Sequence, residues 1–173
     1  FKMSENILKN IIDKKKSRLI KLKKKRPLES LLEHPCDSMA YYNFKGTIEK
    51  NIKENKISII AEIKKASPSA GVIIENYNPV EIANIYKDNK ATCLSVLTEE
   101  DFFLGNLSHI YKIKLNSNPM TDCYGINLPI LCKDFFIDTY QIHLAKYYGA
   151  DAILIILAGV DEKTASNLYE EAL

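Results

Sequence analysis

The sequence contains no uninterrupted apolar run that approaches the ~20 residues a helix needs to cross a bilayer. Near the start of the chain, lysines interrupt the apolar residues, so we find no apolar core of a secretory signal. The net charge is only +2, too small an excess to require a nucleic-acid or membrane partner. We therefore expect a cytoplasmic protein that binds neither nucleic acid nor membrane.

Cysteine and histidine are scarce, and neither is arranged as a set of ligands. The four cysteines include no Cys-x-x-Cys pair, and Cys93 and Cys132 lie in strand-like runs, where a free thiol behaves as a small hydrophobe. This pattern suits a reducing compartment rather than a disulfide scaffold. The three histidines, His34, His109 and His143, share no metal-like spacing, so we expect no metal site.

What the sequence does contain is ordinary globular composition, preceded by a basic helix. The 173 residues, 46% hydrophobic and 27% charged, suffice for one domain with a substantial core. Residues 4–26 carry a partial apolar stripe, and a short amphipathic piece follows between Pro27 and Pro35. The lysine-rich run 14–26 is either a nucleic-acid patch or a solvated helix face. No aromatic residue interleaves it, which favours the solvated face.

After Lys56, strand-like and helix-like runs alternate. This spacing predicts βαβ units and a parallel sheet. The strands are expected to begin near Ile57, Ala91, Leu128 and Asp151. Asn78-Pro79, Asp138 and Asp161 can each begin a helix, residues 107–115 form another, and residues 117–127 read as a loop.

The first of these strands carries charges where a buried strand should be apolar, in the stretch IIAEIKKASPSAG at residues 59–71. Alternation puts Ile60, Glu62 and Lys64 on one face, while the opposite face packs on helices. In parallel α/β folds, ligands bind at the carboxyl ends of the strands. The two charges therefore indicate an active site, with a structural salt bridge as the alternative.

Polar residues also close the next two strands. The run ATCLSVLTEEDFFLG contains Ser95 and ends near Phe103, and LPILCKDFF brings Lys133 to the same rim. A lysine at such a place is either neutralised by desolvation or held charged beside a carboxylate, and both states serve acid–base chemistry. We expect Glu62, Lys64, Ser95 and Lys133 to point into one cavity. We expect a small polar loop after the first strand. Its serines and glycine would offer hydrogen-bond donors to a phosphate, and the phenylalanines would form an apolar wall.

Three stretches, AEIKKASPSAG, SVLTEEDFFLG and LPILCKDFFIDTYQIHLAKYYGADAILII, closely resemble the indole-3-glycerol phosphate synthase family of tryptophan biosynthesis. The resemblance covers roughly residues 57–173, and the preceding helices resemble that family's N-terminal extension. It implies a (β/α)8 TIM barrel, with residues 1–56 as a helical extension and residues 57–173 as the N-terminal half of the barrel, about four βα units.

The resemblance also implies an activity: a carboxy-lyase closes the ring of 1-(2-carboxyphenylamino)-1-deoxyribulose 5-phosphate, with loss of carbon dioxide and water. The family uses no metal or organic cofactor. Other tryptophan-pathway enzymes are candidate partners, and the protein is expected to be a monomer or a weak homo-oligomer. By position, the implied catalytic residues are Lys133 as general acid of ring closure, Lys64 as acid of dehydration and Glu62 as their orienting partner. The implied substrate-binding residues are Ser67 and Pro68 at the phosphate, Ser95 in the second-strand motif, and Phe103, Phe135 and Leu154 around the anthranilate ring.

Two features depart from the family pattern. The loop 117–127 is longer than usual and is expected at the amino end of the barrel, where it is neutral for catalysis.

A complete barrel needs ~250 residues, and the family's general-base glutamate and late phosphate loops are not in this sequence. We expect the chain to be part of a longer enzyme, because four strands alone leave an open edge. The alternatives are an inactive half barrel that serves as a binding or assembly module, and a different phosphosugar enzyme, which the three stretches disfavour.

Overall fold

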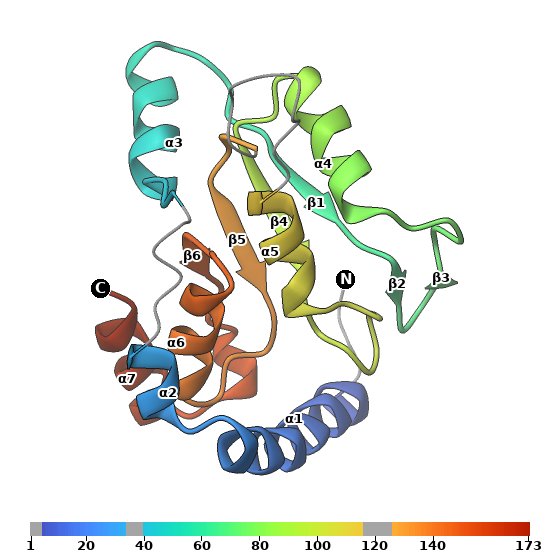
Figure 1. Cartoon of the computed structure of the whole chain (residues 1–173), viewed down its shortest axis with the longest axis vertical. Coiled ribbons are helices and arrows are strands. Elements are labelled where there is room, and N and C mark those ends of the chain that lie inside the picture. Colours follow the sequence, from blue (N-terminus) through green and yellow to red (C-terminus); the bar gives the residue numbers. More distant parts are fainter. Residues whose placement is uncertain (1–4, 34–39, 116–125) are drawn as a thin grey trace.

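A parallel sheet with helices packed on it forms the centre of the protein, an α/β architecture (Figure 1). The computed structural model describes residues 5–33, 40–115 and 126–173. In chain order the elements are α1 (Glu5–Lys25), α2 (Leu28–Glu33), α3 (Phe44–Lys53), β1 (Ile60–Ile63), β2 (Ala66–Ser67), β3 (Gly71–Val72), α4 (Pro79–Asp88), β4 (Cys93–Leu97), α5 (Leu107–Leu115), β5 (Ile130–Lys133), α6 (Tyr140–Tyr147), β6 (Ala152–Ile153), the 3-10 turn η1 (Leu157–Gly159) and α7 (Glu162–Ala172).

The main sheet has the order β1-β4-β5-β6, and each neighbouring pair is parallel. The spatial order thus follows the chain order, and α4, α5 and α6 connect the successive strands. In the register, Glu62 lies beside Ser95, and Leu97 lies beside Lys133. The predicted parallel sheet is confirmed, and the carboxyl ends of β1, β4 and β5 meet along one rim.

Two local expectations for the sheet were inaccurate. The strands begin one to three residues later than predicted. In the first strand, Ile57 and Ile59 are 88% and 53% exposed, and both precede the paired residues of β1. The segment after β1, expected to be a loop, forms an antiparallel hairpin in which Ser67 lies beside Gly71. Gly71 has a φ of +64°, which a residue without a side chain adopts at little cost.

The hydrophobic core lies between the sheet and the helices that connect its strands. Its largest cluster takes Ile63 from β1, Leu94 and Val96 from β4, and Ile110 and Ile113 from α5. Cys93 and Cys132 are buried and free, as predicted, and burial raises the pKa of the Cys132 thiol to about 12. Both thiols therefore act as small hydrophobes at neutral pH.

Helix caps follow the signals in the sequence. The Asn78 side chain accepts hydrogen bonds from the backbone N–H groups of Val80 and Glu81, at the start of α4. Asp161 caps α7 by accepting from the N–H of Thr164 at 2.7 Å. At α6 the cap differs slightly, because the helix begins after Thr139 while the preceding Asp138 still accepts from the N–H of Tyr140. The predicted loop 117–127 falls almost entirely outside the described residues.

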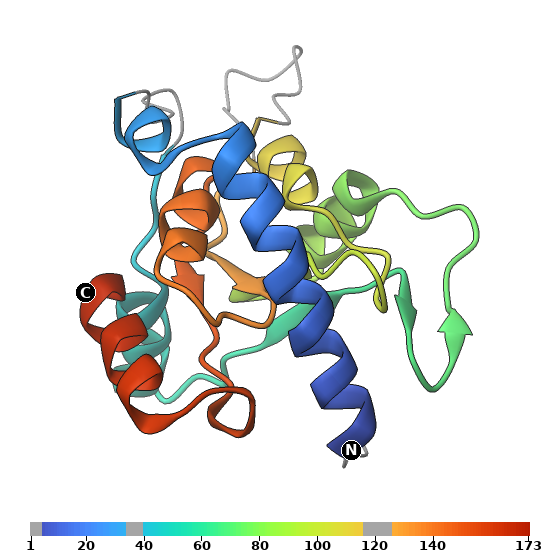
Figure 2. The same cartoon turned by 90° about the horizontal axis from the view of Figure 1, so that it is seen from below.

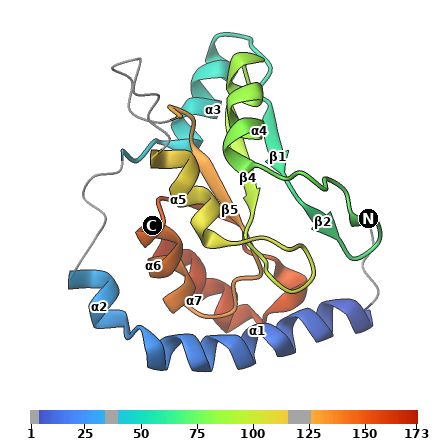
Figure 3. The same cartoon turned by 45° about the vertical axis from the view of Figure 1, so that its right-hand side comes forward.

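Two helices of the N-terminal region lie at opposite ends of the sheet (Figures 2 and 3). Helix α1 crosses the carboxyl ends of the strands, whereas α3, which the sequence analysis did not identify, lies at their amino ends, where Asn51 donates to Ser58 and Thr92. Most lysines of α1 are exposed, as expected for a solvated face, but Lys15 is buried. No helix in the described ranges is long and apolar enough to span a membrane.

A buried ion pair ties the amino ends of the strands together. Lys114 Nζ lies 2.7 Å from Asp151 Oδ2, and the two side chains are 2% and 0% exposed. The ammonium also donates to the carbonyl of Ala40, and the carboxylate accepts from the N–H groups of Tyr42 and Ile130. Burial lowers the pKa of Lys114, and Asp151 acts against that shift. The pair joins α5, the starts of β5 and β6, and the segment before α3.

Replacing one member of this pair should destabilise the protein strongly. In the full-length protein, Lys114→Met leaves the Asp151 carboxylate buried without its cation, and we expect the free energy of unfolding to fall by about 3–5 kcal/mol. Lys112→Met, at an exposed position of the same helix, should change it by less than about 0.5 kcal/mol. Chemical denaturation of both variants measures the difference, and similar losses would contradict a structural role for the pair.

Candidate active site

Three charged side chains meet where β1 and β5 end. Glu62 lies within β1 and Lys64 follows that strand directly, so both side chains project from the same face. Lys133 is the last residue of β5. The Glu62 carboxylate receives the Lys64 ammonium at 2.8 Å on one oxygen and the Lys133 ammonium at 2.5 Å on the other. A single carboxylate thus holds two ammonium groups from different strands.

Opposing influences set the ionisation of Glu62. Partial burial acts to raise its pKa, but hydrogen bonds from Lys133 and Lys64, together with their charges, outweigh burial and hold the pKa below its usual value. The carboxylate therefore stays ionised throughout the neutral range. Its two oxygens are both engaged, so it fixes the directions in which the two ammonium groups point.

The β2–β3 hairpin places small polar groups beside this charged cluster. The Ser67 hydroxyl lies 3.4 Å from that of Ser69 and accepts a hydrogen bond from the N–H of Ala70. Ser67, Pro68 and Ser69 line the same cleft as Glu62 and the two lysines. Hydroxyl groups beside two cations form a suitable environment for an anion such as a phosphate.

Apolar residues make up much of the remaining wall of this strand-end cleft, which has a volume of about 600 Å³. The rings of Phe103 and Phe135 lie 6.3 Å apart with an interplanar angle of 39°. Leu97 belongs to β4, the strand between β1 and β5. It lies in register with Lys133 and lines the cleft. The remaining apolar lining comes from Leu8, Ile156 and Ala158. A cleft of this size, apolar with a few convergent polar groups, suits a small-molecule ligand.

The loop that carries Phe103 is held by the buried carboxylate of Glu99. Glu99 is 1% exposed and accepts hydrogen bonds from the backbone N–H groups of Asp101, Phe102 and Phe103. The return of the loop passes close to β4, where a Cβ atom on Gly105 would lie 2.4 Å from the Leu97 carbonyl oxygen. Any larger residue at that position would move the loop and with it the phenylalanine wall.

The structure brings together most of the site residues expected from the sequence. Glu62, Lys64, Lys133, Ser67, Pro68, Phe103 and Phe135 all line the strand-end cleft, whereas Ser95 and Leu154 are missing from its lining in the described part of the chain. Ser95 lies beside Glu62 in the register, and its buried hydroxyl has no hydrogen-bond partner among the described residues. Leu154 follows β6 and is 36% exposed.

The sequence analysis missed several residues of the cleft. Leu97 could have been found, since it follows the same alternation as Ser95. Leu8 comes from α1, and Ile156 and Ala158 come from the segment after β6, so only the tertiary structure brings them to the rim. In the described ranges, no group of three or more His, Cys, Asp or Glu side chains is placed to hold a metal ion. The charged groups of the cleft can bind an anion and exchange protons with it.

Comparisons with known proteins show which family the sequence resembles. The family model described as indole-3-glycerol phosphate synthase matches residues 8–173. A protein of that name from Aliarcobacter butzleri is 45% identical over 166 residues, 96% of this chain and 60% of the relative. Another, from Trichodesmium erythraeum, is 40% identical over 154 residues, 89% of this chain and 48% of the relative.

A third relative has a different name. The tryptophan biosynthesis protein TrpCF of Buchnera aphidicola subsp. Schizaphis graminum is 42% identical over 167 residues, which are 92% of this chain and 32% of that protein. The chain spans 48–60% of the length of the first relatives described above. Since the family model extends over nearly the whole sequence, the chain belongs to the indole-3-glycerol phosphate synthase family.

Proposed function

We propose that the protein containing this chain is an indole-3-glycerol phosphate synthase, a carboxy-lyase of tryptophan biosynthesis. The reaction would close the ring of 1-(2-carboxyphenylamino)-1-deoxyribulose 5-phosphate, with loss of carbon dioxide and water, to yield indole-3-glycerol phosphate. The observation that carries this proposal is the Glu62 carboxylate shared between Lys64 and Lys133 at the ends of two strands. Membership of the family supports the same assignment.

We further propose that the complete protein is a (β/α)8 barrel with a helical extension. Residues 1–56 would form that extension, and residues 57–173 would supply the first four βα units. The sheet order supports this arrangement, because it follows the chain without reversal. A doubly wound sheet reverses its order at a switch point, whereas a barrel adds each strand beside the previous one.

In this mechanism the two lysines donate protons and Glu62 orients them. Lys133 acts as general acid at the ketone oxygen of the substrate while the new ring bond forms. Lys64 contacts the substrate and donates a proton to the hydroxyl that leaves as water. Glu62 stays ionised beside both, since its pKa is held low, and it helps to transfer protons between steps. Proton transfers by positioned groups contribute ~10²–10⁴-fold to the rate.

The rest of the cleft would bind the two ends of the substrate. Ser67 and Pro68 would lie at the phosphate. Phe103 and Phe135 would enclose the anthranilate ring together with Leu154, although Leu154 is missing from the described lining of the cleft. Ser95 would contribute from β4, where it lies beside Glu62 in the register.

The partners proposed are a phosphorylated small molecule and other enzymes of the tryptophan pathway. The relative named as the tryptophan biosynthesis protein TrpCF supports such an association, because this chain matches only 32% of it. We propose a monomer or weak homo-oligomer in the cytoplasm.

Formation of indole-3-glycerol phosphate by the purified full-length protein tests this function. A chain that only binds or assembles would yield no product, even with the substrate at saturating concentration.

Lys133 should contribute to turnover far more than to binding. In the full-length protein, Lys133→Ala and Lys133→Met should each lower kcat by ~10²–10⁴-fold, because both remove the proton donor. The KM should change much less, since the interaction is made mainly in the transition state. Methionine keeps most of the side-chain volume, so it separates lost chemistry from a packing defect. Near-normal kcat for Lys133→Met would assign the proton to another group, with Lys64 as the first candidate.

Ser67 should show the opposite kinetic pattern. Ser67→Ala removes a contact to the phosphate that exists in both the ground state and the transition state, so KM should rise while kcat stays within about threefold. Steady-state kinetics of the full-length protein measure both constants, and Ser69→Ala on the same hairpin gives a matched comparison. A fall in kcat at unchanged KM would place Ser67 in the chemical step instead.

The charge on Glu62 should contribute to stability in a pH-dependent way. Its pKa is lower in the folded protein than the ordinary 4.5, so its stabilising effect is present above pH ~4.5 and is lost as the pH falls through the folded pKa. The difference in stability between the full-length wild type and Glu62→Gln should therefore be largest near neutral pH and shrink in acid. Thermal melts from pH 7 to pH 3 measure it. A difference that grows toward low pH would show that the two lysines do not hold the carboxylate ionised.

A further inference from the structure

A lysine interrupts the buried stripe of α1. Ile11 and Leu19 are 0% and 6% exposed, and Lys15, which lies four residues from each, is only 7% exposed. Residues at this spacing share one face of a helix, so Lys15 occupies a position where an apolar side chain would pack. Burial of a charged group is costly unless a partner compensates it.

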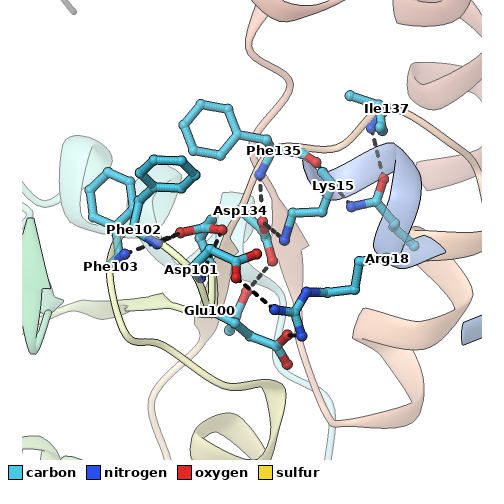
Figure 4. Close-up of polar contacts among 12 residues, drawn as sticks. Lys15, Arg18, Glu100, Asp101, Phe102, Phe103, Asp134, Phe135 and Ile137 are labelled. Atoms are coloured by element: carbon cyan, nitrogen blue, oxygen red, sulfur yellow. Dashed lines mark hydrogen bonds and ion pairs between the residues drawn. The ribbon is translucent and has the colours of Figure 1, made fainter. Parts of the chain in front are cut away.

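The partner of Lys15 is Asp134, which follows β5 and lines the strand-end cleft; Figure 4 shows the pair. Lys15 Nζ lies 2.7 Å from Asp134 Oδ1, and the side chains are 8% and 9% exposed. The other carboxylate oxygen accepts a hydrogen bond from the Thr98 hydroxyl at 2.9 Å. The pair therefore joins α1 to the ends of both β4 and β5.

Asp134 stands between two residues of the cleft, and the two are held by different contacts. Lys133, which precedes it, has its ammonium fixed by Glu62. Phe135, which follows it, is held at its backbone: its N–H donates to Asp134 at 2.7 Å, and its carbonyl accepts from Gln141. Loss of the cation behind Asp134 should thus displace the phenylalanine more than the lysine.

We propose that Lys15 is a positioning residue of the substrate site. Through Asp134 it fixes the backbone of Phe135 and so the apolar wall that receives the aromatic part of the substrate. The proposal rests on the proposed function for its kinetic consequence, but the geometric claim concerns the protein without substrate. Lys15 itself does not line the cleft; it lines the small cavity beneath α1, and Asp134 reaches both.

The kinetic test compares three lysine variants of the full-length protein. Lys15→Met should raise the KM roughly tenfold and leave kcat within about threefold, because the wall contacts the substrate in both ground and transition states. Lys16→Met, at the exposed neighbouring position, should leave both constants unchanged. Lys114→Met breaks an equally buried pair at the amino ends of the strands, so it should lower stability without raising the KM.

A double-mutant cycle tests whether Lys15 acts through Asp134. Asp134→Asn keeps one oxygen that can accept from the N–H of Phe135, and its amide NH₂ can donate to the Thr98 hydroxyl, but it removes the negative charge. If the pair acts as a unit, Lys15→Met combined with Asp134→Asn should raise the KM no more than the more severe single variant. Multiplication of the two single effects would show that the residues act by separate routes and would overturn the proposal.

A spectroscopic measurement tests the geometry without activity. In protein labelled with 4-fluorophenylalanine, the ¹⁹F resonance that disappears in Phe135→Leu belongs to Phe135. We expect this resonance to shift or broaden in Lys15→Met and to stay unchanged in Lys16→Met and Lys114→Met. An unchanged Phe135 signal in Lys15→Met, or an equal KM rise in Lys114→Met, would refute the positioning role. If the wild type forms no product while the Phe135 signal still moves, the proposed function fails and the positioning role stands.

Discussion

The arrangement of this site depends on one carboxylate that two ammonium groups share. Glu62 can reach both Lys64 and Lys133 only because β1 and β5 lie on either side of β4 in a fixed parallel register. Without the carboxylate, two cations from the strands on either side of β4 would project into the same partly desolvated space and would repel each other. A shift of one residue in the pairing of a strand would turn all its side chains to the other face. The ion pairs therefore form only in this register, and they stabilise it in turn.

Two buried lysine–aspartate pairs lie at opposite ends of the sheet, and β5 is the strand that both of them contact. Lys114 and Asp151 join elements at the amino ends, which in parallel α/β folds contribute stability, whereas Lys15 and Asp134 lie behind the carboxyl ends, where ligands bind. The chemistry of the two pairs is the same. What differs is the element each pair holds: the first holds strand starts and a connecting segment, and the second holds the wall of the cleft.

Much of the architecture could be predicted from local signals. Period-two alternation placed Glu62 and Lys64 on one face, and the position of Lys133 at the end of an apolar run placed it at the same rim. The capping residues Asn78 and Asp161 correctly predicted where two helices begin. These signals succeed because each depends on residues that are close in the sequence.

The parts that were missed depend on contacts between distant segments. Nothing local distinguishes Lys15 from its exposed lysine neighbours, because its partner Asp134 lies more than one hundred residues away. Leu8 reaches the cleft only because α1 crosses the strand ends. Ser95 shows the converse: alternation gave its face correctly, but in the tertiary structure its side chain is buried and is missing from the described lining of the cleft.

The choice of a charge pair instead of apolar packing beneath α1 has a physical consequence. Replacement of a buried ion pair by hydrophobic residues of similar volume is often neutral or stabilising, so such a pair is weak evidence for stability. Apolar side chains tolerate small shifts, whereas Asp134 must satisfy Lys15, Thr98 and the N–H of Phe135 at once. Such a network permits one arrangement of the loop and penalises others. We therefore interpret the pair as a contact that fixes the position of the end of β5 relative to α1. A cleft that orients an aromatic ring beside two proton donors requires this position to be fixed.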